Sequence, residues 1–241
     1  MKIAILTDTN SGITKKTAQE MGVFVIPMPV IIDDETFFEG ENITEAAFYD
    51  ALQKGKKITT SQPSPGSVLE MWEELLESGY EQIVYIPMTS GLSKSCETAM
   101  GLAKSYEGRV FVVDNHRISV PLKESVLAAL KMADAGMSGD KIKASLEETA
   151  YHCSIYIMVE TLEYLKKGGR ITPAAAMIGS VLNIKPVLTI QGEKLDSFAK
   201  VRGTKKGHKV MIEAIRRDLE TRFAGEDLTH LRIATAGANL T

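Results

Sequence analysis

Residues 2–12 read KIAILTDTNSG, and this stretch decides the fold class. Residues 2–7 are an apolar run with the length of a buried strand, and residues 8–12 have the composition of a polar loop. The pattern then predicts a short helix from Thr14 onward. A strand that leads through a polar loop into a helix is typical of a parallel α/β sheet.

The same order of elements returns farther along the chain. Residues 23–32 are apolar, but Pro27 and Pro29 favour an edge strand or an extended segment there. A helix is predicted from Thr44, and apolar residues at helical spacing predict another after residue 67. The further elements expected in this half are strands at 83–87 and 110–113, a polar loop at 88–93, and helices at 95–106, 122–135 and 138–150.

Two helices in succession break this alternation, so we place a domain boundary after residue 152. The sequence predicts an N-terminal α/β domain at 1–152, with an open and mainly parallel sheet flanked by helices. A second α/β domain, of mixed topology, is predicted at 153–241. Its expected elements are a strand at 155–159, a hairpin over 186–201, a helix at 205–222 and a strand at 231–235. Because the chain stops soon after that strand, we expect this domain to be truncated.

Composition excludes several classes of protein. The chain has 241 residues, 44% of them hydrophobic and 24% charged, which is the balance of a globular protein with a sizeable core. A net charge of −3 from interspersed charges gives no field that attracts nucleic acid or anionic membrane. The first residues resemble neither a signal peptide nor a membrane span, so a cytoplasmic protein is expected. Cys96 and Cys153 are expected to be reduced, and no Cys or His spacing predicts a metal site.

Two hydroxyl-rich loops carry most of the chemical interest. Residues 59–65 read TTSQPSP and residues 89–93 read TSGLS, and each loop lies between an extended segment and a predicted helix. Helix N-termini present unpaired N–H groups and a partial positive charge, which favour an oxyanion. Hydroxyls such as those of Thr60, Ser61 and Ser93 can add hydrogen bonds to it. Helix capping explains a single loop of this kind as well, and the residues alone leave both interpretations open.

Catalytic interpretations have less support. A nucleophilic role for Ser93 lacks the G-x-S-x-G arrangement, and none of the four histidines stands in a context that suggests a base. No G-x-x-x-x-G-K-[ST] loop for nucleotide phosphates is present. Asp8, at the end of the first strand, is expected to cap its loop rather than to hold a metal.

Two basic segments occur in the second half. Residues 164–172 read YLKKGGRIT and residues 200–206 read KVRGTKK. Cations at a helix end are favourable by themselves. As a functional alternative, Arg170 and Arg202 are candidates for docking a protein partner, because arginine is enriched at interface hot spots.

Several short motifs follow one another in a characteristic order along the chain. They are ILTDT at 5–9, TTSQP at 59–63, TSGLS at 89–93, VVD at 112–114, LKKGGRI at 165–171, KPVL at 185–188 and KVR at 200–202. In this order the sequence resembles the DegV family of bacterial fatty-acid-binding proteins. The resemblance extends from Met1 almost to the strand predicted at 231–235.

The resemblance implies a long-chain fatty acid as ligand, buried between or within the two domains. Thr60, Ser61 and Ser93 would contact its carboxylate. It also implies a separate ATP-dependent fatty acid kinase subunit that converts the bound acid to an acyl-phosphate, with Arg170 and Arg202 helping to dock it. The chain itself would then be no enzyme and would need no cofactor. The alternative is a small-molecule phosphoryl-transfer or other enzyme on a related fold.

The sequence departs from the family pattern at three places. Lys94-Ser95-Cys96-Glu97 stands where the family tends to have Gly-Thr-Tyr-Gln, and Asn115 stands where it has Ser. Nothing in the sequence matches the family's C-terminal segment, which carries a His and a glycine-rich turn. The family pattern therefore does not determine the chain-length preference of this protein, and a weaker carboxylate site is expected if the functional protein lacks this segment.

Overall fold

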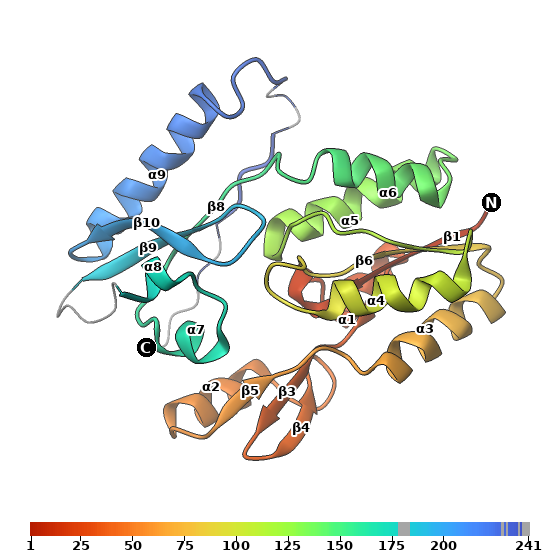
Figure 1. Cartoon of the computed structure of the whole chain (residues 1–241), viewed down its shortest axis with the longest axis horizontal. Coiled ribbons are helices and arrows are strands. Elements are labelled where there is room, and N and C mark those ends of the chain that lie inside the picture. The colour runs from red at the N-terminus through yellow and green to blue at the C-terminus, as the bar shows by residue number, and fades with distance from the viewer. Residues whose placement is uncertain (178–183, 228, 230, 236, 238–241) are drawn as a thin grey trace. The chain divides into compact units, whose positions relative to one another are not determined.

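The computed structural model describes residues 1–177, 184–227, 229, 231–235 and 237. These residues group into two compact units, Met1–Ala150 and Tyr151–Gly237, called unit 1 and unit 2 below. Figure 1 shows their helices and strands. Both units are α/β, as the sequence predicted. The domain boundary expected after residue 152 stays a prediction.

Unit 1 is built on an open sheet in which every strand pair is parallel. The strand order is β2-β1-β6-β7. Its strands are β1 (Ile3–Asp8), β2 (Phe24–Ile26), β6 (Gln82–Ile86) and β7 (Val110–Val112). The apolar runs at residues 2–7, 83–87 and 110–113 therefore form three neighbouring strands, the central β1 and β6 and the edge strand β7, which confirms the parallel sheet.

Helices cover both faces of this sheet, because the side chains of a strand point alternately to opposite faces. Ala4 and Leu6 pack against α3 and α4 around the buried Trp72, whereas Ile5 packs against α1, α5 and α6 around the buried Leu122. The helices are α1 (Lys15–Met21), α3 (Pro65–Glu77), α4 (Ser95–Ala103), α5 (Ser119–Asp134) and α6 (Gly139–Glu148), with short 3-10 turns at η1 (Thr9–Ser11) and η2 (Lys104–Tyr106).

A smaller antiparallel sheet, in the order β4-β3-β5, completes unit 1. It packs with helix α2 around Val30, Ile32 and Ala51. Its elements are β3 (Pro29–Ile32), β4 (Glu35–Phe38), β5 (Ile58–Thr60) and α2 (Glu45–Gln53).

The single extended segment expected at residues 23–32 is wrong in one respect, since it forms two strands in two different sheets. β2 is an edge strand of the parallel sheet, and β3 lies in the middle of the antiparallel one. Pro29 is tolerated because it is the first residue of β3. The unpredicted β4 follows a tight turn in which Asp33 and Asp34 have φ of 49° and 73°. Left-handed Asp residues suit such hairpin turns.

Unit 2 has a mixed arrangement of one antiparallel sheet and three helices among its described residues. The strand order is β10-β9-β8. Its elements are β8 (Ile155–Met158), α7 (Glu163–Gly168), α8 (Pro173–Ala176), β9 (Lys185–Ile190), β10 (Asp196–Val201) and α9 (Thr204–Glu220). The β9–β10 pair is the expected hairpin, and α9 is the expected long helix.

Helix α9 packs closely on β8. A Cβ atom at Gly207 would lie 2.2 Å from Sδ of Met158, so only glycine permits this approach. Farther along α9, the buried Asp218 accepts a hydrogen bond of 2.8 Å from the hydroxyl of Tyr156. Burial and this hydrogen bond raise the pKa of Tyr156 to about 12.

The prediction of a strand at residues 231–235 is wrong. These residues have no strand conformation, and all but the first are exposed. An extended segment needs a neighbouring strand to satisfy its backbone groups. Among the described residues, no helix is long and apolar enough to cross a membrane.

Candidate functional site

The parallel sheet of unit 1 has a topological switch point between β1 and β6. From β1 the sheet continues through β2 on one side and through β6 and β7 on the other. In open α/β sheets, ligands bind outside the carboxyl ends of the strands at such a point. The loops that follow β1 and β6 are therefore the first place to look for a site.

Asp8 joins these two loops. Its carboxylate is fully buried and accepts hydrogen bonds from the backbone N–H of Met88 at 2.8 Å and of Asn10 at 2.9 Å. The side-chain amide of Asn10 donates a third, at 3.0 Å. Burial raises the pKa of Asp8 above its usual 3.8, and these hydrogen bonds oppose that shift. Asp8 thus caps its loop, as predicted. Over the described part of the chain, no group of three or more His, Cys, Asp or Glu side chains is placed to hold a metal.

The loop after β6 is held from several sides. The backbone N–H of Thr89 donates to the carbonyl of Arg117 at 3.0 Å, and the carbonyl of Thr89 accepts the N–H of Ser93 at 3.3 Å. The half-buried Ser93 accepts the N–H of Ser95 on its Oγ at 3.2 Å, at the start of α4. Because Ser93 is the acceptor in this bond, its hydroxyl proton can point to a ligand oxygen.

The loop after β5 is more open. Thr60 is the last residue of β5, opposite Val30 of β3, and it is exposed. Ser61 is also exposed and donates its hydroxyl to the carbonyl of the next residue, Gln62, at 3.1 Å. Ser64 then caps α3 by accepting the N–H of Ser67 at 3.0 Å.

A hydrogen bond connects the first hydroxyl loop to α4, the helix that follows the second hydroxyl loop. Oγ1 of Thr98, on α4, donates to Oε1 of Gln62 at 3.2 Å. Gln62 follows Ser61 directly, and α4 begins two residues after Ser93. The structure therefore brings the loops that carry Thr60, Ser61 and Ser93 to the same part of unit 1.

A third loop at this edge was missed as part of the site. Oδ1 of Asp114, just after β7, accepts the backbone N–H of Ser90 at 3.3 Å and of His116 at 3.4 Å. His116 and Ser119 have φ of 54° and 58°, a conformation that costs energy for non-glycine residues and clusters at functional sites. Asn115 is fully buried, and its amide nitrogen has no hydrogen-bond partner among the described residues. The polar run DNHR after a third buried strand was the signal for this loop.

A cavity of about 770 Å³ lies beside the loop that follows β1 in unit 1. It is lined mainly by α1, β2 and residues 39–41. One of the two switch-point loops, the loop after β1, also lines the cavity with Thr9, Gly12, Ile13 and Thr14. Thr60, Ser61 and Ser93 are not part of its lining, so this cavity is not assigned to the hydroxyl loops.

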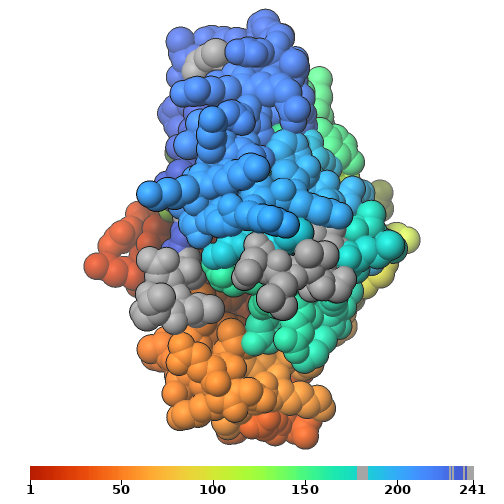
Figure 2. Space-filling view, turned by 90° about the vertical axis from the view of Figure 1, so that its left-hand side faces the viewer, coloured from red at the N-terminus to blue at the C-terminus, as the bar shows by residue number. Residues whose placement is uncertain are grey.

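The two predicted docking arginines lie in unit 2. Arg170 is half-buried, and its guanidinium folds back to the carbonyl of Gly168 at 2.6 Å. Arg202 is exposed in the turn between β10 and α9, elements that form part of the blue surface in Figure 2. Arg170 accepts the N–H of Leu195, just before β10, whereas Arg202 follows β10. The length of β10 therefore places the backbones of Arg170 and Arg202 roughly 20 Å apart.

Comparison with known proteins gives consistent matches over most of the chain. The family model described as "Uncharacterised protein, DegV family" matches residues 2–236. A DegV domain-containing protein of Streptomyces coelicolor is 34% identical over 204 residues, which are 85% of this chain and 73% of that protein. A DegV domain-containing protein of Deinococcus radiodurans is 33% identical over 218 residues, 90% of this chain and 77% of that one.

Two solved structures have similar levels of sequence identity to the chain. A fatty-acid-binding DegV family protein from Thermus thermophilus has a TM-score of 0.83 at 31% identity, covering 92% of this chain and 79% of its own. DegV of Bacillus subtilis, described as a fatty acid binding protein, has a TM-score of 0.80 at 29% identity, with 91% and 79% covered. The family model and these relatives agree over nearly the whole sequence, and the chain therefore belongs to the DegV family.

Proposed function

We propose that this protein binds a long-chain fatty acid and holds its carboxylate with Thr60, Ser61 and Ser93. The observation that carries the proposal is the hydrogen bond between Asp8 and Met88 at the switch point. It fixes the start of the loop that ends in Ser93, at the position where open α/β sheets bind ligands. Similarity to two structures described as fatty-acid-binding supports the same ligand.

The chemistry of the loops suits a carboxylate. Ser93 precedes α4, whose N-cap residue Lys94 makes no side-chain capping bond. The N-terminal end of a helix carries a partial positive charge, which stabilises an anion. Hydroxyl donors add about 1.5–3 kcal/mol per hydrogen bond to a charged group, without adding a charge of their own.

In this proposal the protein presents the acid instead of transforming it. A separate ATP-dependent fatty acid kinase subunit would phosphorylate the carboxylate, and Arg170 and Arg202 would help to dock that subunit. The exposed guanidinium of Arg202 offers a planar set of donors to a carboxylate on a partner. Because Arg170 lies roughly 20 Å away, the two arginines would contact different parts of the partner.

The ligand is tested by organic extraction of the purified protein followed by mass spectrometry. Ser93→Ala is expected to retain less fatty acid than the wild type. Lys94→Ala is the matched control, because Lys94 is the adjacent residue, is exposed and pairs only with Glu97, at 2.9 Å, among the described residues. Equal retention in the two variants would count against the role of Ser93. Repeated failure to recover any fatty acid from the wild type would reject the proposed function.

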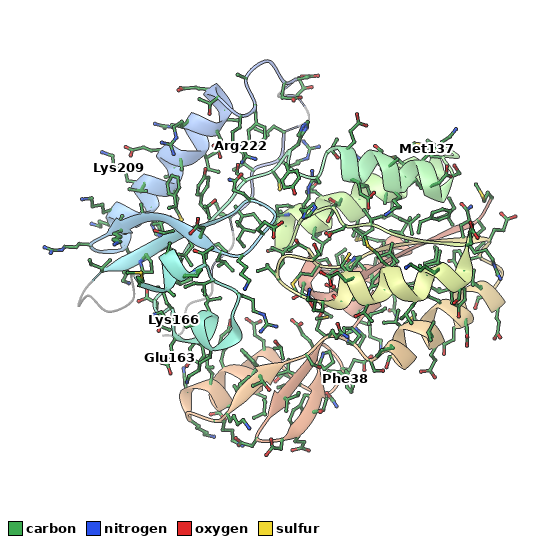
Figure 3. All side chains as sticks on the ribbon, viewed as in Figure 1. Phe38, Met137, Glu163, Lys166, Lys209 and Arg222 are labelled. Carbon is green, nitrogen blue, oxygen red and sulfur yellow. The ribbon has the colours of Figure 1, made fainter. Side chains whose placement is uncertain are left out.

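The docking role is tested by mixing the loaded protein with a fatty acid kinase subunit and ATP, and following acyl-phosphate formation. Arg202→Ala is expected to raise the protein concentration needed for half-maximal rate. The control is Lys209→Ala, an exposed cation on α9 that pairs with Glu213 (Figure 3). If both variants behave like the wild type, Arg202 does not dock the partner.

A further inference from the structure

The last residues of unit 1 are held by one arginine. Helix α6 ends at Glu148, and a helix leaves its final carbonyls without intrahelical partners. The guanidinium of Arg117 donates to the carbonyl of Ala150 through Nε at 3.2 Å and to the carbonyl of Thr149 through Nη2. Its Nη1 also donates to the hydroxyl of Ser125, at 3.0 Å. Arg117 thereby fixes the end of α6, immediately before unit 2 begins.

The first residues of unit 2 are held by another arginine. Arg222 follows α9, as Figure 3 shows. Its Nη2 donates to the carbonyl of Tyr151 at 2.9 Å, and its Nη1 donates to the carbonyl of Cys153 at 3.2 Å and to the hydroxyl of Ser154. Each unit thus contains an arginine that binds its own side of the segment at residues 149–154.

Among the described residues, Arg117 also contacts the loop at residues 89–93, whereas Arg222 has no hydrogen bond to it. The carbonyl of Arg117 accepts the N–H of Thr89 at 3.0 Å, and the N–H of Arg117 donates to Oδ1 of Asn115 at 3.3 Å. Thr89 in turn accepts the N–H of Ser93. All side-chain hydrogen bonds of Arg222 within the described residues go to positions 151–154.

The backbone around Arg117 needs such support. His116 directly precedes it and is left-handed, as is Ser119 two residues later. Residues in this conformation persist only where surrounding contacts hold them. The side-chain hydrogen bonds of Arg117 to Ser125, Thr149 and Ala150 supply contacts of that kind, and they keep its carbonyl in place for Thr89.

We propose that Arg117 is a positioning residue that couples the ligand loop at residues 89–93 to the segment that connects the two units. The proposal rests on the proposed binding of a fatty acid at Ser93. A bound carboxylate adds a further contact to the loop that Asp8 and Arg117 already hold, the loop holds the backbone of Arg117, and the guanidinium of Arg117 holds Thr149 and Ala150. Coupling of this kind is reciprocal, so contacts that hold the backbone of residues 149–150 also increase the affinity for the fatty acid.

The first test measures the affinity of the delipidated protein for palmitate. Arg117→Ala is expected to bind at least about tenfold more weakly than the wild type. Arg222→Ala, which removes the matching arginine in unit 2, is expected to bind palmitate as the wild type does. Arg117→Lys should recover part of the affinity, because it keeps the charge but has fewer donors. Equal affinities in Arg117→Ala and Arg222→Ala, whether both are lowered or both unchanged, would overturn the proposal.

A second test uses the wild type, so it does not depend on how the variants fold. Palmitate is expected to slow amide hydrogen exchange both at residues 89–93 and at residues 149–150. Slowing confined to residues 89–93 would overturn the coupling and leave fatty-acid binding intact. Failure of the wild type to bind palmitate at all would reject the proposed function together with the coupling.

Discussion

The two hydroxyl loops look alike in sequence and differ in structure. The loop at residues 59–65 begins within the end of β5, a strand of the small antiparallel sheet, and its Thr60 and Ser61 are exposed. The loop at residues 89–93 follows the central strand β6, and Thr89 is fully buried in it. Asp8 binds the backbone just before this second loop, and Arg117 binds its first residue. Similar composition therefore gives one exposed loop and one that is held in place.

This difference bears on how each loop can bind an anion. A donor that is already fixed loses little conformational entropy when a ligand arrives, so more of its hydrogen-bond energy appears as affinity. Ser93 is such a donor, since its own backbone N–H and its Oγ are both engaged. We expect Ser93 to anchor the carboxylate and the exposed hydroxyls of Thr60 and Ser61 to adapt to it.

The largest effect is expected for Asp8→Ala. Removing this buried carboxylate leaves the N–H groups of Met88 and Asn10 without their acceptor, which costs about 3 kcal/mol in the free energy of unfolding. Urea denaturation measures this loss. The control is Asp50→Ala, since Asp50 is exposed, pairs with Lys54 on the surface and should change stability by less than about 0.5 kcal/mol. Equal losses in both variants would mean that Asp8 does not hold the second loop.

The pH dependence of stability offers a related test. Burial raises the pKa of Asp8 in the folded protein above its usual 3.8. The unfolded chain therefore releases this proton at lower pH than the folded one, and the stability contributed by Asp8 falls as pH rises above that value. Urea denaturation from about pH 4 to about pH 7 should show wild-type stability falling relative to Asp8→Asn. A constant difference across this range would show that the folded pKa is not raised.

Two serines near the starts of α3 and α4, Ser64 and Ser93, should separate stability from binding. Ser64→Ala removes the N-cap of α3 and is expected to cost about 1 kcal/mol in unfolding free energy. We expect its affinity for palmitate to stay at the wild-type value. For Ser93→Ala we expect the reverse, so that the loss of binding free energy for palmitate exceeds the loss of unfolding free energy. The comparison of the loops fails if Ser64→Ala weakens palmitate binding as much as Ser93→Ala does.

The smallest effect is expected for Thr98→Val, which removes the hydrogen bond to Gln62 at nearly constant side-chain volume. A loss of about 0.5 kcal/mol in unfolding free energy is expected. Hydrogen exchange should become faster at residues 60–63 and stay unchanged at residues 89–93. Faster exchange in both loops would show that the second loop depends on the first.

Much of the fold could be read from local patterns. Short apolar runs followed by polar loops predicted the parallel strands, and the position of Asp8 after the first strand predicted its capping role. Patterns of this kind work because hydrophobic periodicity and loop chemistry act over a few neighbouring residues. Residues 23–32 show the limit of such patterns, because no local feature of this apolar segment predicts that it forms strands in two different sheets.

The sequence by itself determined the α/β class, the hydroxyl loops and the family resemblance, because each depends on residue types at short spacing. Only the tertiary structure decided which loop is held in place. Asp8 and Met88 are 80 positions apart, and Arg117 lies 33 positions from Ala150. Contacts over such separations arise only when the strands pair into a sheet, because this pairing brings the loops at their carboxyl ends together. No local sequence pattern specifies which residues then meet.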